Sequence, residues 1–192
     1  MDTVCHIFGP HRLALERCAA RAARSGAGIH APGHAARGHP AGFSCADRLA
    51  DLLSLLGEKA EGIVYAFLRI GNGKIMDNVD CGGMAARVDL DSGRLLTVAA
   101  DKAGNTFTKH PITGTEIIGF QLPCFEEAKA MCLEAMRMVP SMRYVAWDVA
   151  LTEQGPTLIE GNSFPSHAVP QFAAHYPDKI GILPEFRKFI DI

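Results

Sequence analysis

Two apolar, β-branched segments near the C-terminus are joined by a loop of only three residues. The segments 144–152 and 156–161 are separated by Glu153-Gln154-Gly155. A short loop that ends in glycine favours a β-hairpin, because glycine readily adopts the left-handed conformation that closes such a turn. We therefore expect two antiparallel strands in this part of the chain.

The register of this hairpin can be predicted by counting outward from the loop. The loop pairs Thr152 with Pro156. Equal steps from that pair place Asp148 opposite Glu160. Asn162 lies on the same face as Glu160, because side chains two residues apart on a strand point the same way. Two carboxylates and a carboxamide are thus expected on one patch.

This patch needs an explanation, since directly opposed like charges destabilise a strand pair. The flanking residues are apolar and favour a largely buried sheet. A divalent cation would resolve the conflict, because carboxylate and carbonyl oxygens are the hard ligands that Mg²⁺ prefers. The alternative from residue types alone is the solvated face of an exposed hairpin.

The segments between residue 62 and this hairpin fit strands and one helix. Strands are expected over 63–70, 84–90 and 94–100, and 74–79 can return as a further strand after the turn Gly71-Asn72-Gly73. A helix is predicted over 125–139, since its apolar residues repeat on one face: Phe125, Ala128, Cys132, Ala135 and Val139. Antiparallel strands with an inserted helix predict the α+β class, a mostly antiparallel sheet with packed helices.

The first 60 residues differ in composition from the rest. Between Ala19 and Gly42, 22 of 24 residues are Ala, Gly, Arg, His or Pro, so this stretch can bury little apolar surface and is expected to be poorly ordered. Its three histidines (His30, His34 and His39) lack companion carboxylates or thiols, which disfavours a metal site. A short amphipathic helix is predicted over 47–56. We expect an atypical segment over 1–60 and the folded domain over 61–192.

Bulk properties exclude several classes of protein. The formal net charge of −2 disfavours a nucleic-acid binder. The sequence contains no run of about 18 apolar residues, so no membrane-spanning helix is expected. The N-terminus lacks the pattern of a signal peptide, and the six cysteines form no CxxC pair, so they are expected to be free thiols. These features predict a cytoplasmic protein.

Five short motifs occur in an order that resembles one branch of a known superfamily. They are Leu68-Arg69-Ile70-Gly71, Asp77-Asn78 with Gly82-Gly83, His110-Pro111-Ile112-Thr113-Gly114, Trp147-Asp148, and Ile159-Glu160-Gly161-Asn162. The order over about residues 62–190 resembles the sugar-transfer-associated ATP-grasp proteins, which are related to RimK-type α-L-glutamate ligases. The resemblance implies the C-terminal half of the ATP-grasp fold.

The resemblance also implies roles for individual residues. Asp148, Glu160 and Asn162 would hold Mg²⁺ (or Mn²⁺) ions that bridge the phosphates of ATP. Arg69 would contact the γ-phosphate or an acyl phosphate; its alternative is an ordinary surface arginine.

Four further positions are implied with structural alternatives. Asn78 and the Gly82-Gly83 backbone would line the phosphate or acceptor side, although a simple turn explains them equally. His110 would orient the acceptor, or it is structural. Lys102 and Lys109 are expected to be solvated.

The activity implied is that of an ATP- and Mg²⁺-dependent ligase that activates a carboxylate as an acyl phosphate for attack by an amine. The substrate would be a small or sugar-linked molecule, and the pathway the synthesis of surface polysaccharide. Residues 1–60 are too short to supply the N-terminal lobe and lid of a complete enzyme, so an inactive nucleotide-binding remnant is the alternative. A magnesium-dependent phosphohydrolase is a third reading.

Overall fold

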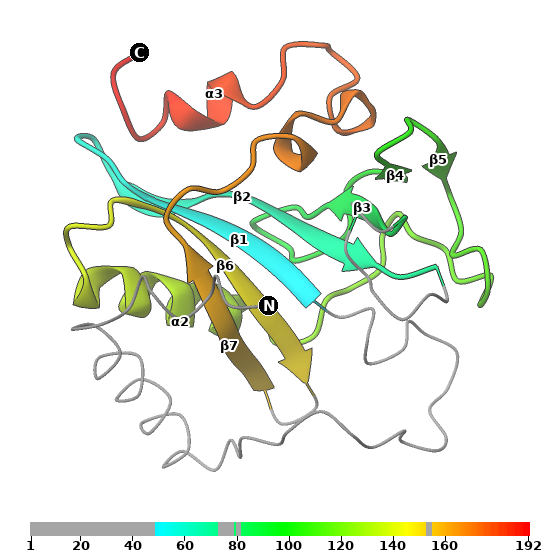
Figure 1. Ribbon diagram of the computed structural model, residues 1–192, viewed down its shortest axis with the longest axis horizontal. Coiled ribbons are helices and arrows are strands. Elements are labelled where there is room, and N and C mark those ends of the chain that lie inside the picture. The colour runs from blue at the N-terminus through cyan, green and yellow to red at the C-terminus, as the bar shows by residue number, and fades with distance from the viewer. Residues whose placement is uncertain (1–48, 73–78, 80–81, 153–154) are drawn as a thin grey trace.

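The computed structural model describes residues 49–72, 79, 82–152 and 155–192. Seven strands in this part form one sheet in the order β5-β4-β3-β2-β1-β6-β7, and all neighbouring strands are antiparallel. The sheet and its helices confirm the α+β class (Figure 1). No helix of the described residues is long and apolar enough to cross a membrane.

The strands are β1 (Leu49–Leu56), β2 (Glu61–Ile70), β3 (Met84–Arg87), β4 (Ala99–Asp101), β5 (Thr106–Phe107), β6 (Tyr144–Thr152) and β7 (Gly155–Asn162). The helices are α2 (Phe125–Met138), α3 (Leu183–Phe186) and two 3₁₀ turns, η3 (Val169–Gln171) and η4 (Ala173–His175).

Helix α2 covers one face of the sheet and confirms the prediction for this segment. Phe125, Ala128 and Cys132 are buried on its inner face, while Glu126 and Glu127 occupy the first turn, where the helix dipole favours negative charge. The residues it covers belong to the central strands and include Leu52, Leu68 and Trp147. This layer is the larger of the two apolar cores.

The segment from η3 to α3 covers part of the opposite face (Figure 1). Its His175 is buried: Nδ1 lies 2.7 Å from the Tyr65 hydroxyl and Nε2 lies 3.1 Å from the Ala85 carbonyl oxygen. Burial lowers the pKa of His175 to about 4 and raises the pKa of Tyr65 well above its usual value. The neutral imidazole of His175 therefore accepts a hydrogen bond from the Tyr65 hydroxyl and donates one to the Ala85 carbonyl oxygen.

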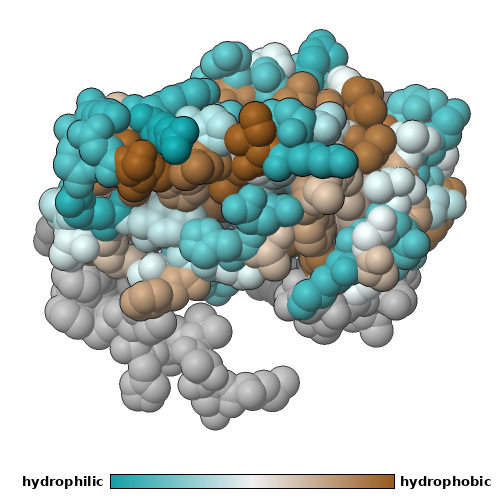
Figure 2. All heavy atoms as spheres, turned by 90° about the horizontal axis from the view of Figure 1, so that it is seen from above, coloured by the Kyte–Doolittle hydropathy of each residue, from teal (hydrophilic) through white to brown (hydrophobic). Residues whose placement is uncertain are grey.

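A second set of side-chain contacts joins the same segment to β3. Arg87 lies 3.0 Å from Glu185 and also over the rings of Tyr65 and Tyr176. The outer surface of the segment carries separate apolar patches among polar side chains (Figure 2). Because the segment stops short of one end of the sheet face, residues at that end border a cleft instead of a core.

The helix predicted over 47–56 is wrong, because Leu49–Leu56 is strand β1. Six of its eight residues are buried, and the strand lies between β2 and β6. A short Leu-rich run fits helical and extended periods equally well, and burial on both faces of a central strand decides in favour of the strand. The expected boundary at residue 60 therefore runs between two hydrogen-bonded strands of one sheet.

The register of the last hairpin departs from the counted one near the loop. Thr152 lies opposite Gly155, one residue earlier than expected. β7 has a bulge at Ile159, which is an extra residue between the partners of Val149 and Asp148. The bulge offsets the one-residue difference at the loop, so Asp148 lies opposite Glu160 as predicted. The tip residues 153–154 lie outside the described part of the chain.

Candidate metal and phosphate site

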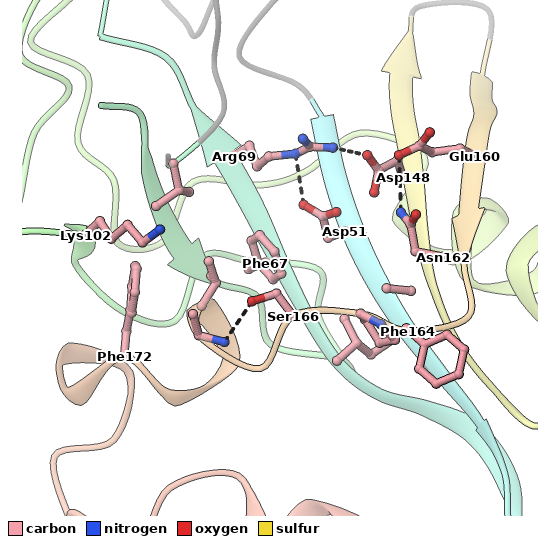
Figure 3. Close-up of a pocket in the computed structure, with 16 residues that line it drawn as sticks. Asp51, Phe67, Arg69, Lys102, Asp148, Glu160, Asn162, Phe164, Ser166 and Phe172 are labelled. Carbon is pink, nitrogen blue, oxygen red and sulfur yellow. Dashed lines mark hydrogen bonds and ion pairs between the residues drawn. The ribbon is translucent and has the colours of Figure 1, made fainter. Parts of the chain in front are cut away.

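A cleft of about 370 Å³ opens on the sheet face that the C-terminal segment leaves uncovered. Its polar end is formed by side chains of β1, β2, β6 and β7: Asp51, Arg69, Asp148, Glu160 and Asn162. Its apolar side includes Phe67, Phe164 and Phe172, and Lys102 borders it from the β4–β5 turn (Figure 3). A charged end beside an apolar wall is typical of a small-molecule site.

Three carboxylates lie in one row across adjacent strands. Asp51 of β1 is opposite Asp148 of β6, and Asp148 is opposite Glu160 of β7. Asn162 follows on the same strand and donates from Nδ2 to Glu160 Oε1 over 3.2 Å. This contact turns the carboxamide toward the row, so the sheet register gathers all three residues predicted from the hairpin.

Arg69 lies against this row from β2. Its Nε is 3.0 Å from Asp51 Oδ2, and its Nη2 donates to Asp148 Oδ2. The side chains of Arg69, Asp51 and Asp148 retain only 14%, 11% and 12% of their exposure, so water screens these ion pairs weakly. The guanidinium offsets the repulsion between the two facing aspartates (Figure 3).

The donor set fits a hard divalent cation. Asp148, Glu160 and the Asn162 carbonyl oxygen are oxygen ligands, and the cleft leaves room for phosphate oxygens and water to complete an octahedron. Among residues 49–72, 79, 82–152 and 155–192, no three His, Cys, Asp or Glu side chains are grouped so that they could hold a metal by themselves. A cation here would thus depend on the carboxamide and on ligands brought by the substrate.

The other predicted positions are arranged differently. Gly82 and Gly83 lie just before β3 and are absent from the cleft wall, although the nearby Val79 is part of it. His110 is buried away from the cleft, where its Nδ1 accepts backbone N–H groups of Ile112 and Thr113, each over 3.2 Å. Asn78 lies outside the described residues.

The sequence alone does not identify Asp51 as a site residue, and it predicts that Lys102 is solvated. Asp51 went unnoticed because its segment was expected to be helical; an aspartate within a leucine-rich run was the available signal. Lys102 is exposed but borders the cleft, whereas Lys109 pairs with Glu116 over 2.6 Å on the surface. Both lysines are exposed, as expected, and Lys102 also borders the cleft.

Comparison with known proteins identifies the family of the chain. No curated protein matches the chain. The model of the family described as sugar-transfer associated ATP-grasp matches residues 54–181, a range that contains Arg69, Asp148, Glu160 and Asn162. The chain therefore belongs to the sugar-transfer associated ATP-grasp family, whose membership implies nucleotide binding and an ATP-dependent, ligase-type function.

Proposed function

We propose that the chain carries the metal and phosphate end of an ATP- and Mg²⁺-dependent ligase that activates a carboxylate as an acyl phosphate. The observation that carries the proposal is the juxtaposition in one cleft of the Asp148–Glu160 pair, Asn162 and Arg69. Acidic oxygen ligands suit the magnesium ion and the neighbouring guanidinium suits the phosphate, so the two together fit a magnesium–phosphate group.

Each side chain has a distinct task in this proposal. Asp148, Glu160 and Asn162 would hold the Mg²⁺, which when bound neutralises charge on the phosphate oxygens. Arg69 would donate two N–H groups to the transferring phosphoryl group, for which the planar guanidinium is well shaped. Lys102, on another wall of the cleft, would add a second positive charge (Figure 3).

The chemistry needs a site that positions charged groups. An oxygen of the substrate carboxylate attacks the γ-phosphorus of ATP, and the bond to the β–γ bridging oxygen breaks, releasing ADP. The resulting acyl phosphate has a good leaving group. An amine then attacks its carbonyl carbon, loses a proton, and expels inorganic phosphate. Arg69 would steady the phosphoryl group through both displacements.

Val79, Gly82 and Gly83 would lie on the acceptor side of the site. Val79 lines the cleft and its carbonyl oxygen accepts the Gly82 N–H over 3.2 Å, which holds the Gly82-Gly83 backbone beside the cleft wall. Gly82 has a φ of 91°, a conformation that glycine adopts readily. The words sugar-transfer associated in the family description support a sugar-linked acceptor.

Trapping of the acyl phosphate tests the proposal. The chain is incubated with ATP, Mg²⁺, a panel of carboxylic acids and hydroxylamine, which converts an acyl phosphate into a hydroxamate. We expect hydroxamate, ADP and phosphate in equal amounts with one class of acid, and their loss in Glu160→Gln. Phosphate release that needs no acid would contradict the proposal and favour a phosphohydrolase, and nucleotide binding without any turnover would favour a binding remnant.

A further inference from the structure

The positive charge that faces the acidic row belongs to the chain itself. Arg69 contacts two of the three carboxylates, Asp51 through Nε and Asp148 through Nη2. All three side chains of this ion triad are largely shielded from solvent. Removing one member of such a shielded set leaves a charge without compensation, which is strongly unfavourable. Arg69 therefore acts as a counter-cation for the acidic row.

This arrangement places Arg69 in competition with a metal ion. Its Nη2 donates to Oδ2 of Asp148, an oxygen of the carboxylate that a bound cation would use. A guanidinium and a divalent cation repel each other strongly at such a distance in a weakly screened site. An ion that reaches Asp148 must therefore displace this arm of Arg69.

Asp51 determines where the displaced guanidinium remains. It lies opposite Asp148 on the adjacent strand, and its Oδ2 lies 3.0 Å from Nε, a different nitrogen of the guanidinium from the Nη2 that contacts Asp148. A guanidinium has five N–H donors in a fixed plane, so Nε can stay beside a carboxylate while other N–H groups turn to a new acceptor. Retention by Asp51 would keep Arg69 in the cleft, beside the phosphate.

We propose that Asp51 and Arg69 form a cation-exchange pair: Arg69 neutralises Asp148 until a divalent cation binds and displaces it, and Asp51 then retains Arg69 for the phosphate. This inference rests on the proposed function, because it takes Asp148 as a metal ligand. Asp51 is a positioning residue in this scheme and acts through Arg69. The scheme accounts for an aspartate that faces another aspartate on a central strand.

The test is calorimetric titration of the full chain with Mn²⁺ alone. The decisive variant is the double substitution Asp51→Asn with Arg69→Gln, which removes the competing guanidinium but leaves the net charge of the cleft unchanged. We expect it to bind Mn²⁺ at least about threefold more tightly than wild type. Asp51→Asn alone is expected to bind more weakly, and Arg69→Lys, which keeps a positive charge, to stay close to wild type.

Thermal unfolding without metal supplies a second readout. Arg69→Gln is expected to lower the melting temperature, and Mn²⁺ to restore more stability to this variant than it adds to wild type. If that variant does not fold, the double variant carries the test, because Asp51 and Arg69 are removed together and the net charge of the triad stays the same.

The outcomes separate this inference from the proposed function. If wild type binds Mn²⁺ as tightly as the double variant or more tightly, the exchange is overturned, but the assignment of the metal site is unaffected. Failure of wild type and of every variant to bind Mn²⁺ alone overturns the exchange, whereas the proposed function falls only if wild type also fails to bind ATP together with Mg²⁺.

Discussion

Gly161 lies directly opposite Trp147, and a β-carbon at Gly161 would approach Cζ3 of the indole to 2.5 Å. These two residues stand next to the proposed ligands, since Trp147 precedes Asp148 and Gly161 separates Glu160 from Asn162. The indole is fixed from its other side, where Nε1 donates to Ser54 Oγ of β1 over 2.8 Å. Close packing on one face of β6 and β7 thus sets the positions of the ligands on the other face.

Substitution of Gly161 by alanine should therefore disturb both stability and the site. A β-carbon cannot fit unless the buried indole moves, and overpacking of this kind costs about 1–3 kcal/mol. We expect a corresponding decrease in the free energy of unfolding, measured by urea denaturation. The same change in a Trp147→Phe background, where the smaller ring leaves space, should cost less. Equal costs in the two backgrounds would show that the indole contact is not the cause.

Stability should fall in mild acid because of His175. Burial holds its native pKa at about 4, whereas an unfolded histidine titrates near its usual value of 6.5. Between these two pH values the unfolded chain binds the proton and the native chain does not, so stability decreases as the pH falls from 6.5 toward 4. The loss attributable to this residue is at most about 3 kcal/mol.

Urea denaturation at a series of pH values measures this effect. His175→Gln provides the control, since glutamine keeps hydrogen-bonding capacity but does not titrate. The variant should be less stable at neutral pH and should show a shallower decline between pH 6.5 and 4. An identical decline in wild type and variant would assign the acid sensitivity to other groups.

Lys102 should contribute to nucleotide affinity, because it borders the cleft and would approach the phosphates. Replacement by methionine keeps the length of the side chain but removes its charge. We expect the affinity for Mg²⁺–ATP to fall about threefold to tenfold, which corresponds to roughly 1 kcal/mol. Lys109→Met is the matched control, since Lys109 pairs with Glu116 on the surface and should have no effect. Equal effects of the two substitutions would indicate only a general influence of charge.

The parts of the fold that the sequence predicted are those determined by local signals. The glycine-containing loop after Thr152 and the helical repeat from Phe125 to Met138 specify their elements within a few residues. The bulge at Ile159 compensated for an error of one residue at the loop, so Asp148 and Glu160 were paired correctly.

The rest of the site depends on contacts between distant segments. Arg69 and Asp148 are 79 positions apart, and their ion pair follows from the insertion of β1 between β2 and β6. Because the sequence predicts a helix over 47–56, it indicates neither this sheet order nor the proposed role of Asp51. An apolar run of eight residues becomes a strand here through burial on both faces, which its own sequence does not specify.

Calorimetric titration with ATP, in the presence and absence of Mg²⁺, tests the central claim most directly. Glu160→Gln removes one proposed ligand charge, and Glu127→Gln on the exposed side of α2 is the matched control. We predict that wild type and Glu127→Gln bind ATP only with Mg²⁺, and that Glu160→Gln weakens this binding by about tenfold or more. ATP binding that is independent of Mg²⁺, or unchanged in Glu160→Gln, would contradict the assignment of Asp148, Glu160 and Asn162 as the metal site.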